Sequence, residues 1–325
     1  MSIDNKFNKL CIFFAITLFT TTSYCISSEI AKGLVAEAKN IVSTSFKSPD
    51  GIIRTNAIEV VSTSRKSEFF PEIVELLKDD MVLVRFAAAV AIGDLGYKGC
   101  EKQLRQLLRD PDLNVKIAAA YALCKLGEIQ QLAVIQKAVE ADDQTVKANA
   151  AMLLGKLKSR ESLTILYHLK DSENSSDAVA FNAAEAIARI GDEKIYQKIW
   201  TMLISVYADV RCMGVYAMGA LGGNKGASAI STMLDDDVPQ VRLVAAEQLG
   251  ALGDKSGQFV VLEYLASPPR QEKEMVEKCN RLAALAIGQI GSDKLAEYLP
   301  KLLKNDSPAV QLASAKSIFM LSGHN

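Results

Sequence analysis

The sequence repeats itself with a period of about 31 residues, and this period restricts the possible folds more than any other feature. The motif is clearest from Leu83 to Gly96, where small and apolar residues follow a valine and an arginine. Six of the eight intervals between copies have this length, and the other two are longer. A fixed period of this size is typical of repeat proteins, in which each unit packs mainly on its neighbours. We anchor the nine copies at Ile53, Val84, Val115, Val146, Val179, Val210, Val241, Cys279 and Val310.

The positions that recur in each copy lie on one face of an α-helix. Apolar residues stand eight positions after every anchor, and Leu or Ile stands eleven positions after all anchors but the first. These spacings match the helical period. A small residue at the fourth position lets the next hairpin approach closely. This small column consists of Ala57, Ala88, Ala119, Ala150, Ala183, Gly214, Ala245, Ala283 and Ser314.

Each copy continues with a turn and a second amphipathic helix. A glycine follows the first helix in most copies, as at Gly96 and Gly191, where it can adopt the left-handed conformation that ends a helix. Acidic residues such as Asp79, Asp110 and Asp143 precede many first helices and are expected to cap them. The repeat therefore predicts an all-α fold, a right-handed α-solenoid of about nine helical hairpins over residues 49–325.

This motif resembles the HEAT-like repeats of the bacterial phycobilisome-lyase type. In that family an Asp-rich turn precedes the pattern Val-Arg-x-x-Ala-Ala-x-Ala-Leu-Gly-x-Leu-Gly, and residues 83–96, 210–222 and 241–253 match it closely. The resemblance covers residues 49–325 and implies an armadillo-like superhelix of paired helices. It is specific for the fold and not for an activity, because scaffolds, lyases and a hydroxylase share these repeats.

The N-terminal segment 1–25 differs from the rest of the chain. Lys6 and Lys9 precede a short apolar segment at 10–19, followed by small polar residues, which predicts a secretory signal peptide over 1–25. We therefore expect the protein to be periplasmic or secreted. Alternatively, the segment stays uncleaved as a membrane anchor, or Cys25 carries a lipid. Residues 26–48 are predicted to form a helix that caps the first hairpin.

Charge and cysteine usage exclude several classes of function. The formal net charge of −1 lacks the basic excess of most nucleic-acid-binding proteins, so we expect a protein or peptide partner. None of the six cysteines is in a Cys-x-x-Cys pair, and the last four fall in four different repeats, which disfavours a disulfide framework or a zinc site. They are expected to be small buried residues.

A basic residue directly follows the anchor in six copies, as in Arg54, Arg85 and Arg211. One interpretation is a ladder of ion pairs with the acidic turns of adjacent repeats, since acids and bases recur in phase. The other is a basic stripe that binds an anionic partner.

The second helices are expected to line the concave side of the array, and their outward positions carry the chain's most distinctive side chains. We predict a partner site there because exposed aromatic residues often anchor protein interfaces. The alternative is that the same rings fold between the helices and fill the inner layer. The predicted site consists of Tyr167, His168, Trp200, Phe259 and Leu262.

No catalytic arrangement is found in the sequence. There are two histidines, His168 and His324, and no His-Glu pair of the kind with which deoxyhypusine hydroxylase, a HEAT-like enzyme, holds iron. We expect no metal and no cofactor. The predicted function is a non-catalytic scaffold or adaptor in the cell envelope that binds a protein or peptide on its concave face. The resemblance leaves one alternative, a lyase-like accessory protein that holds a tetrapyrrole.

Overall fold

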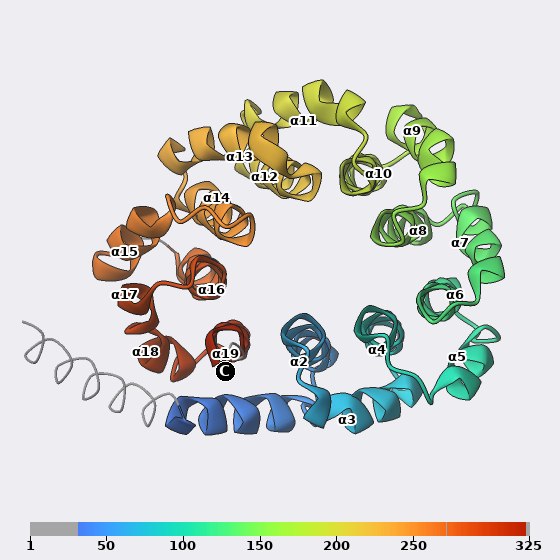
Figure 1. Ribbon diagram of the computed structural model, residues 1–325, viewed down its shortest axis with the longest axis horizontal. Coiled ribbons are helices and arrows are strands. Elements are labelled where there is room, and N and C mark those ends of the chain that lie inside the picture. The colour runs from blue at the N-terminus through green and yellow to red at the C-terminus, as the bar shows by residue number, and fades with distance from the viewer. Residues whose placement is uncertain (1–31, 271, 323–325) are drawn as a thin grey trace, which may run out of the picture.

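In the computed structural model, which describes residues 32–270 and 272–322, the helices form two concentric layers around a central opening (Figure 1). The predicted signal peptide lies outside the described residues. No strand occurs among the described residues, and the prediction of an α-solenoid of about nine hairpins is confirmed. The inner layer contains α2 (Gly51–Ser64), α4 (Val82–Leu95), α6 (Leu113–Lys125), α8 (Gln144–Lys156), α10 (Asp177–Ile190), α12 (Ala208–Leu221), α14 (Pro239–Ala251), α16 (Lys273–Ile290) and α19 (Pro308–Ser322).

The inner helices are the first helices of the repeats, and the second helices form the outer layer. The expectation that the second helices line the concave side is therefore wrong. Side chains of the inner helices that point away from the core columns face the opening instead. The outer layer contains α3 (Phe70–Glu75), α5 (Glu101–Leu107), α7 (Leu132–Ala138), α9 (Leu163–Asp171), α11 (Tyr196–Leu203), α13 (Gly223–Ser231), α15 (Gln258–Ala266), α17 (Asp293–Ala296) and α18 (Leu299–Leu303).

The core between the two layers follows the predicted columns. All nine residues of the small column are buried, and a Cβ on Gly214 would come within 2.9 Å of Leu203 Cδ2. Asp143 caps α8 by accepting the amide of Thr145 at 2.7 Å. Gly96 ends α4 in the left-handed region, with a φ of 64°. The predicted cap is confirmed at Asp143 and the predicted helix end at Gly96. The expected caps at Asp79 and Asp110 are wrong, because α4 begins after Met81 without a side-chain cap and α6 is capped by Asp112.

A second column of small residues brings neighbouring inner helices together. Gly93, Gly155 and Gly250, nine positions after their anchors, touch the next inner helix. A Cβ on Gly155 would lie 2.6 Å from the Cα of Ala186. Inner helices in such close contact, beneath an outer layer spaced by larger side chains, give the array a strong curvature.

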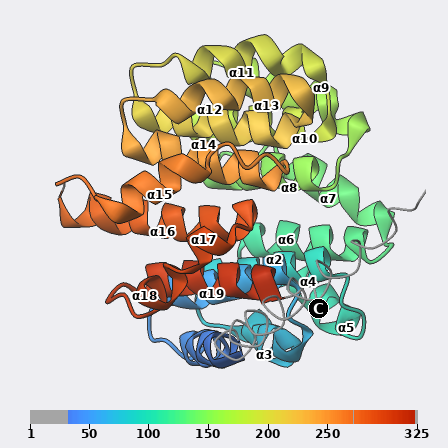
Figure 2. The ribbon, with the colours of Figure 1, turned by 60° about the vertical axis from the view of Figure 1, so that its left-hand side comes forward.

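The curvature closes the array into a ring. The last inner helix, α19, packs against α16 on one side and against the first inner helix, α2, on the other. Figure 2 shows α2 and α19 side by side in a second view. An ion pair joins Lys316 Nζ to Glu59 Oε1 at 3.5 Å across this contact. The ammonium group of Lys66 lies 5.2 Å from the ring centroid of Phe319.

The helix over 32–45 completes the outer layer at the closure. It lies between α18 and α3 in Figure 1, where no second helix follows α19 among the described residues. Its buried residues Ala38 and Val42 face the core, and Lys39 pairs with Glu68 at 3.1 Å. A groove of about 470 Å³ runs between this helix and the C-terminal helices. The N-terminal helix thus supplies the missing partner of α19.

The closure buries polar side chains of the last repeat. Ser314, Lys316 and Ser317 of α19 are all buried. Ser317 Oγ donates to the carbonyl of Ala284 at 2.6 Å, so its hydroxyl is satisfied inside the α16–α19 contact. No helix among the described residues has the length and apolar character needed to span a membrane.

Candidate binding surfaces

Three arginines form a repeated ion-pair ladder along one edge of the ring. Each follows its anchor and pairs, through two hydrogen bonds, with an aspartate in the turn before the next inner helix. In the pair of Arg211 and Asp236, Nε donates to Oδ2 at 2.6 Å and Nη2 to Oδ1 at 2.8 Å. Nη1 donates to the carbonyl of Ser205 in the preceding turn at 3.0 Å. The same geometry joins Arg54 to Asp79 and Arg85 to Asp110.

The ladder explains three of the six recurring bases as structural residues. Burial opposes ionisation of Asp79 and Asp236, yet hydrogen bonds from arginine and backbone amides hold the pKa of both carboxyl groups below its ordinary value. For Lys116 and Lys147, the place of that aspartate is taken by Ala141 and Ser172, which offer no carboxylate. Arg242 has no aspartate partner among the described residues either and donates to backbone carbonyls, so the ion-pair interpretation is confirmed for the copies of Arg54, Arg85 and Arg211.

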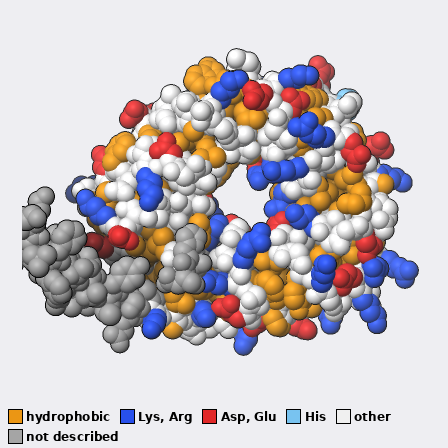
Figure 3. Space-filling view, viewed as in Figure 1, with side chains coloured by type: hydrophobic (Ala, Val, Ile, Leu, Met, Phe, Trp, Pro, Cys, Tyr) orange, Lys and Arg blue, Asp and Glu red, His pale blue; other side chains and the backbone are white. Residues whose placement is uncertain are grey.

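The inner wall of the ring carries a charged cluster beside the closure. This inner-wall cluster draws one side chain each from α2, α12, α14, α16 and α19. Arg281 is exposed, whereas Lys316 is 8% exposed and Glu247 only 7% exposed. Figure 3 shows the opening through the ring, with lysine and arginine side chains gathered around it. The cluster consists of Glu59, Tyr216, Glu247, Arg281 and Lys316.

Glu247 is the most perturbed carboxyl group of this cluster. Burial raises its pKa to about 7, and the charge of Glu59 acts in the same direction. The positive charges of Lys316 and Arg281 and a hydrogen bond with Tyr216 oppose this rise without cancelling it. The Oε2 atom of Glu247 has no hydrogen-bond partner among the described residues. An unsatisfied buried oxygen costs free energy, which marks this position as something other than ordinary packing.

A second polar group lies on the inner wall across α4, α6 and α8. The hydroxyl of Tyr121 donates to Asp94, and Lys156 Nζ lies 2.9 Å from the other oxygen of the same carboxylate. Burial and the negative charge of Asp94 both raise the pKa of Tyr121. Tyr121, Tyr216, Glu247 and Lys316 all stand six positions after their anchors. No functional residue was predicted in this column, although the repeat places it on the helix face opposite the core columns.

The predicted aromatic site lies on the outside of the ring. Tyr167 and His168 are on α9 and Trp200 is on α11, which are neighbouring outer helices (Figure 1). Phe259 and Leu262 are on α15, and α13 separates them from Trp200. The structure therefore divides the predicted residues into two groups.

Burial differs among these residues. His168 is exposed and Phe259 is 54% exposed. Tyr167, Trp200 and Leu262 are partly buried against the core. The ring of Trp200 stacks on Tyr196 at a centroid distance of 6.2 Å. Packing thus accounts for much of the surface of three of the five residues, and a partner site at these residues stays a prediction.

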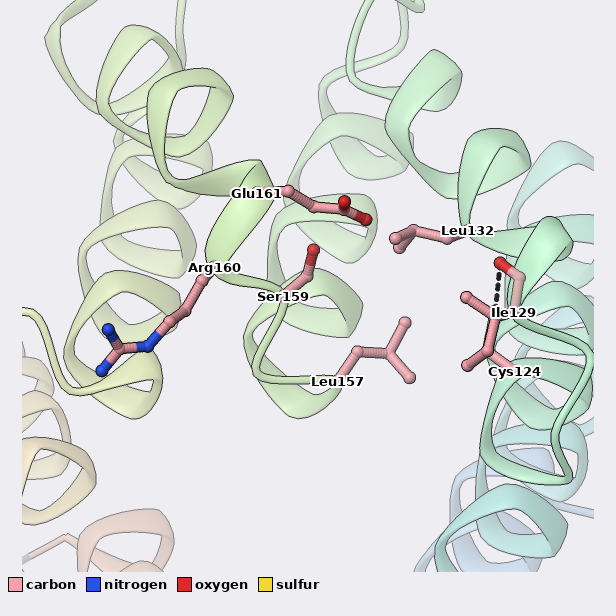
Figure 4. A pocket seen from close by; sticks show the side chains of 7 residues that line it. All are labelled: Cys124, Ile129, Leu132, Leu157, Ser159, Arg160 and Glu161. Atoms are coloured by element: carbon pink, nitrogen blue, oxygen red, sulfur yellow. Dashed lines mark hydrogen bonds between the residues drawn. The ribbon is translucent and has the colours of Figure 1, made fainter.

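A pocket of about 320 Å³ opens between consecutive hairpins, beside α6, α7 and α8 (Figure 4). Leu132 and Leu157 face each other across it, and Glu161 and Ser159 stand at one side, while the guanidinium group of Arg160 points away. Cys124 forms part of the wall. This lining is mainly apolar and brings no acid and base together for catalysis.

Neither reactive cysteines nor a metal-binding cluster is found among the described residues. Four cysteines, Cys100, Cys124, Cys212 and Cys279, are free and buried. Burial raises the pKa of the first three to about 11, which keeps them protonated and weakly nucleophilic. The described part of the chain also holds no cluster of three or more His, Cys, Asp or Glu side chains placed to bind a metal ion.

Comparison with known proteins agrees with the fold. Overlapping segments at 71–144, 101–176 and 132–211 match the family model of HEAT repeats. Residues 71–211 of this chain therefore resemble HEAT repeats. A search of the curated proteins finds no relative that matches it.

Two of the solved structures to which the chain is similar are of enzymes. Human deoxyhypusine hydroxylase is 18% identical to this chain, with a TM-score of 0.40. The match covers 80% of this chain and 97% of the hydroxylase chain. A chain from the complex of CpcE and CpcF of phycocyanin lyase from Nostoc is 17% identical, with a TM-score of 0.46. That match covers 76% of this chain and 94% of the lyase chain. These likenesses concern the fold alone.

Proposed function

We propose that this protein is a non-catalytic scaffold that binds a protein or peptide segment on the concave face of its HEAT array. In the closed ring that face is the inner wall around the opening. The inner-wall cluster carries the proposal, because it gathers charged and hydroxyl side chains from five helices beside the opening. Glu247 in particular is buried at a cost that a bound donor would reduce.

The composition of the inner wall indicates the chemistry of the partner segment. Arg281 presents a planar group of hydrogen-bond donors suited to a carboxylate, and Lys316 lies beside it. Glu59 keeps its carboxylate 64% exposed despite its contact with Lys316. Mixed charges of this kind favour a segment that carries both signs, in contrast to a uniformly acidic or basic one.

Photo-crosslinking tests this assignment. p-Benzoylphenylalanine at positions 285 and 152, on the inner wall six positions after their anchors, should capture a partner protein that mass spectrometry identifies. The same group at position 201, on the exposed face of α11, serves as the control. Arg281→Glu should reduce capture, whereas Lys198→Glu on the outer layer should not. Capture from position 201 alone would contradict an inner-wall site.

We also propose that the protein is exported and acts in the periplasm or outside the cell. Support comes from the basic start, the short apolar segment at 10–19 and the small polar residues after it. N-terminal sequencing of the protein purified from its native cells should begin after residue 25. An intact N-terminus in a cytoplasmic fraction would refute export.

A further inference from the structure

The turn between α11 and α12 exposes three apolar side chains within a single short loop. Ile204, Val206 and Tyr207 are 68%, 86% and 71% exposed. At the corresponding place other repeats have acidic turns, such as the one at Asp79 and Asp80. Isolated apolar residues on a surface are ordinary, but a cluster in place of a repeated acidic turn indicates an interaction site.

This apolar turn is held in shape by the ion-pair ladder beneath it. Arg211 Nη1 donates to the carbonyls of Ser205 at 3.0 Å and Val206 at 3.3 Å. The amide of Tyr207 donates to Ser205 Oγ at 3.2 Å. Arg211 is itself fixed by two hydrogen bonds to Asp236. Because the backbone is already ordered, a partner that docks on the turn loses little free energy to ordering it.

Acidic turns lie on both sides of the apolar turn. The ladder pairs the starts of neighbouring inner helices, so these helices run in the same direction and all turns that lead into them lie on one edge. The turns at 171–177 and 235–237 are therefore its neighbours on that edge. Asp237 remains 86% exposed in its side chain despite its contact with Arg211. Exposed carboxylates of the flanking turns belong to Asp171, Glu173, Asp177, Asp235 and Asp237.

We propose that this edge is a docking site for a protein segment with two or three apolar side chains flanked by lysine or arginine. The apolar turn supplies the contact area, and the acidic turns on both sides select positive charge. The site lies on the edge of the ring, away from the inner wall, so it goes beyond the proposed function and does not depend on it.

Synthetic peptides provide the probe. A fluorescein-labelled 18-residue amphipathic peptide of leucine and lysine should bind the full chain in fluorescence anisotropy, more weakly in 0.5 M salt. Peptides of the same spacing built from leucine and glutamate, or from serine and lysine, should bind at least tenfold more weakly. The double substitution Val206→Ser, Tyr207→Ser should weaken binding of the leucine–lysine peptide at least tenfold.

Two matched variants separate this site from others. Met81→Ser, Leu83→Ser changes exposed apolar residues at the start of α4 and should leave peptide binding unchanged. Arg281→Glu changes the inner wall and should also leave it unchanged. Equal binding by the glutamate peptide, or no effect of the Val206→Ser, Tyr207→Ser change, would overturn the proposal. Concentration-dependent dimerisation that this change abolishes would also overturn it, because the turn would then be covered by a second copy.

Discussion

Replacing Glu247 by glutamine tests the energetics of the inner wall. The carboxyl group has a pKa of about 7 in the folded ring, against 4.5 for an ordinary glutamate. A raised pKa means that the folded state holds the proton more tightly than the unfolded state. The cost of Glu247 is therefore absent below about pH 4.5, grows as the pH rises and is complete above about pH 7.

The size of this effect follows from the shift. At about 1.4 kcal/mol for each pKa unit, Glu247 lowers the free energy of unfolding by about 3 kcal/mol above pH 7. Glutamine has the same shape and no charge, so the stability advantage of Glu247→Gln over the wild type should grow from about 1 kcal/mol at pH 5 to about 3 kcal/mol at pH 8.

Urea unfolding of both proteins at pH 5, 6, 7 and 8, followed by circular dichroism, measures the difference. Glu185→Gln serves as the control, because Glu185 occupies the same column on α10 and pairs with Arg189 at a partly exposed site. Its stability difference should change by less than about 1 kcal/mol over this range. Parallel pH dependences of the wild type and Glu247→Gln would refute the reasoning, because they would mean that Glu247 is solvated in the folded state.

Three further substitutions, two of them with a control variant, test the packing. Arg211→Ala should lower the free energy of unfolding by about 3–5 kcal/mol in urea titrations, because it strands the buried carboxylate of Asp236, whereas Arg242→Ala breaks no such pair. Gly155→Val should cost at least about 3 kcal/mol in the same assay, since its Cβ meets the Ala186 backbone, while Gly33→Ala, with open space around it, should stabilise by about 0.5–1 kcal/mol. Trp200→Ala should lower the free energy of unfolding by about 1–3 kcal/mol, because it removes the ring that stacks on Tyr196. Partner capture by the same variant tests whether the Trp200 ring also contacts a partner. Lost stability with unchanged capture would reject the outer aromatic site.

The repeat unit was predictable because its recurring residues are determined by packing and capping between residues close in the sequence. The small column at positions such as Ala88 and Ala150, the glycine ends and the aspartate caps all act within one hairpin or between two neighbours. The pairing of Arg85 with Asp110 was foreseeable for the same reason, because the base and the acid recur in phase along the chain.

Ring closure was not predictable from the repeat, because it depends on the sum of many small rotations between hairpins. Its signals are present but spread over the chain: the glycines at the ninth position, the helix at 32–45 and the polar residues of α19. Ser317 and Lys316 look like surface residues until α2 is known to cover them. The concave face was assigned to the wrong helices because the spacing of apolar residues shows which side of a helix faces the core. It does not show whether the first or the second helices of the repeats form the inner layer.

The distance between the first and last inner helices tests closure most directly. Spin labels on Thr63→Cys and Ser322→Cys, with other accessible cysteines replaced, report this distance by double electron–electron resonance. Packed helices lie about 8–10 Å apart at their axes, so the closed ring predicts a single narrow distribution below about 30 Å, label arms included. A broad distribution centred beyond about 50 Å, as expected of an open array with each hairpin adding about 10 Å, would contradict it.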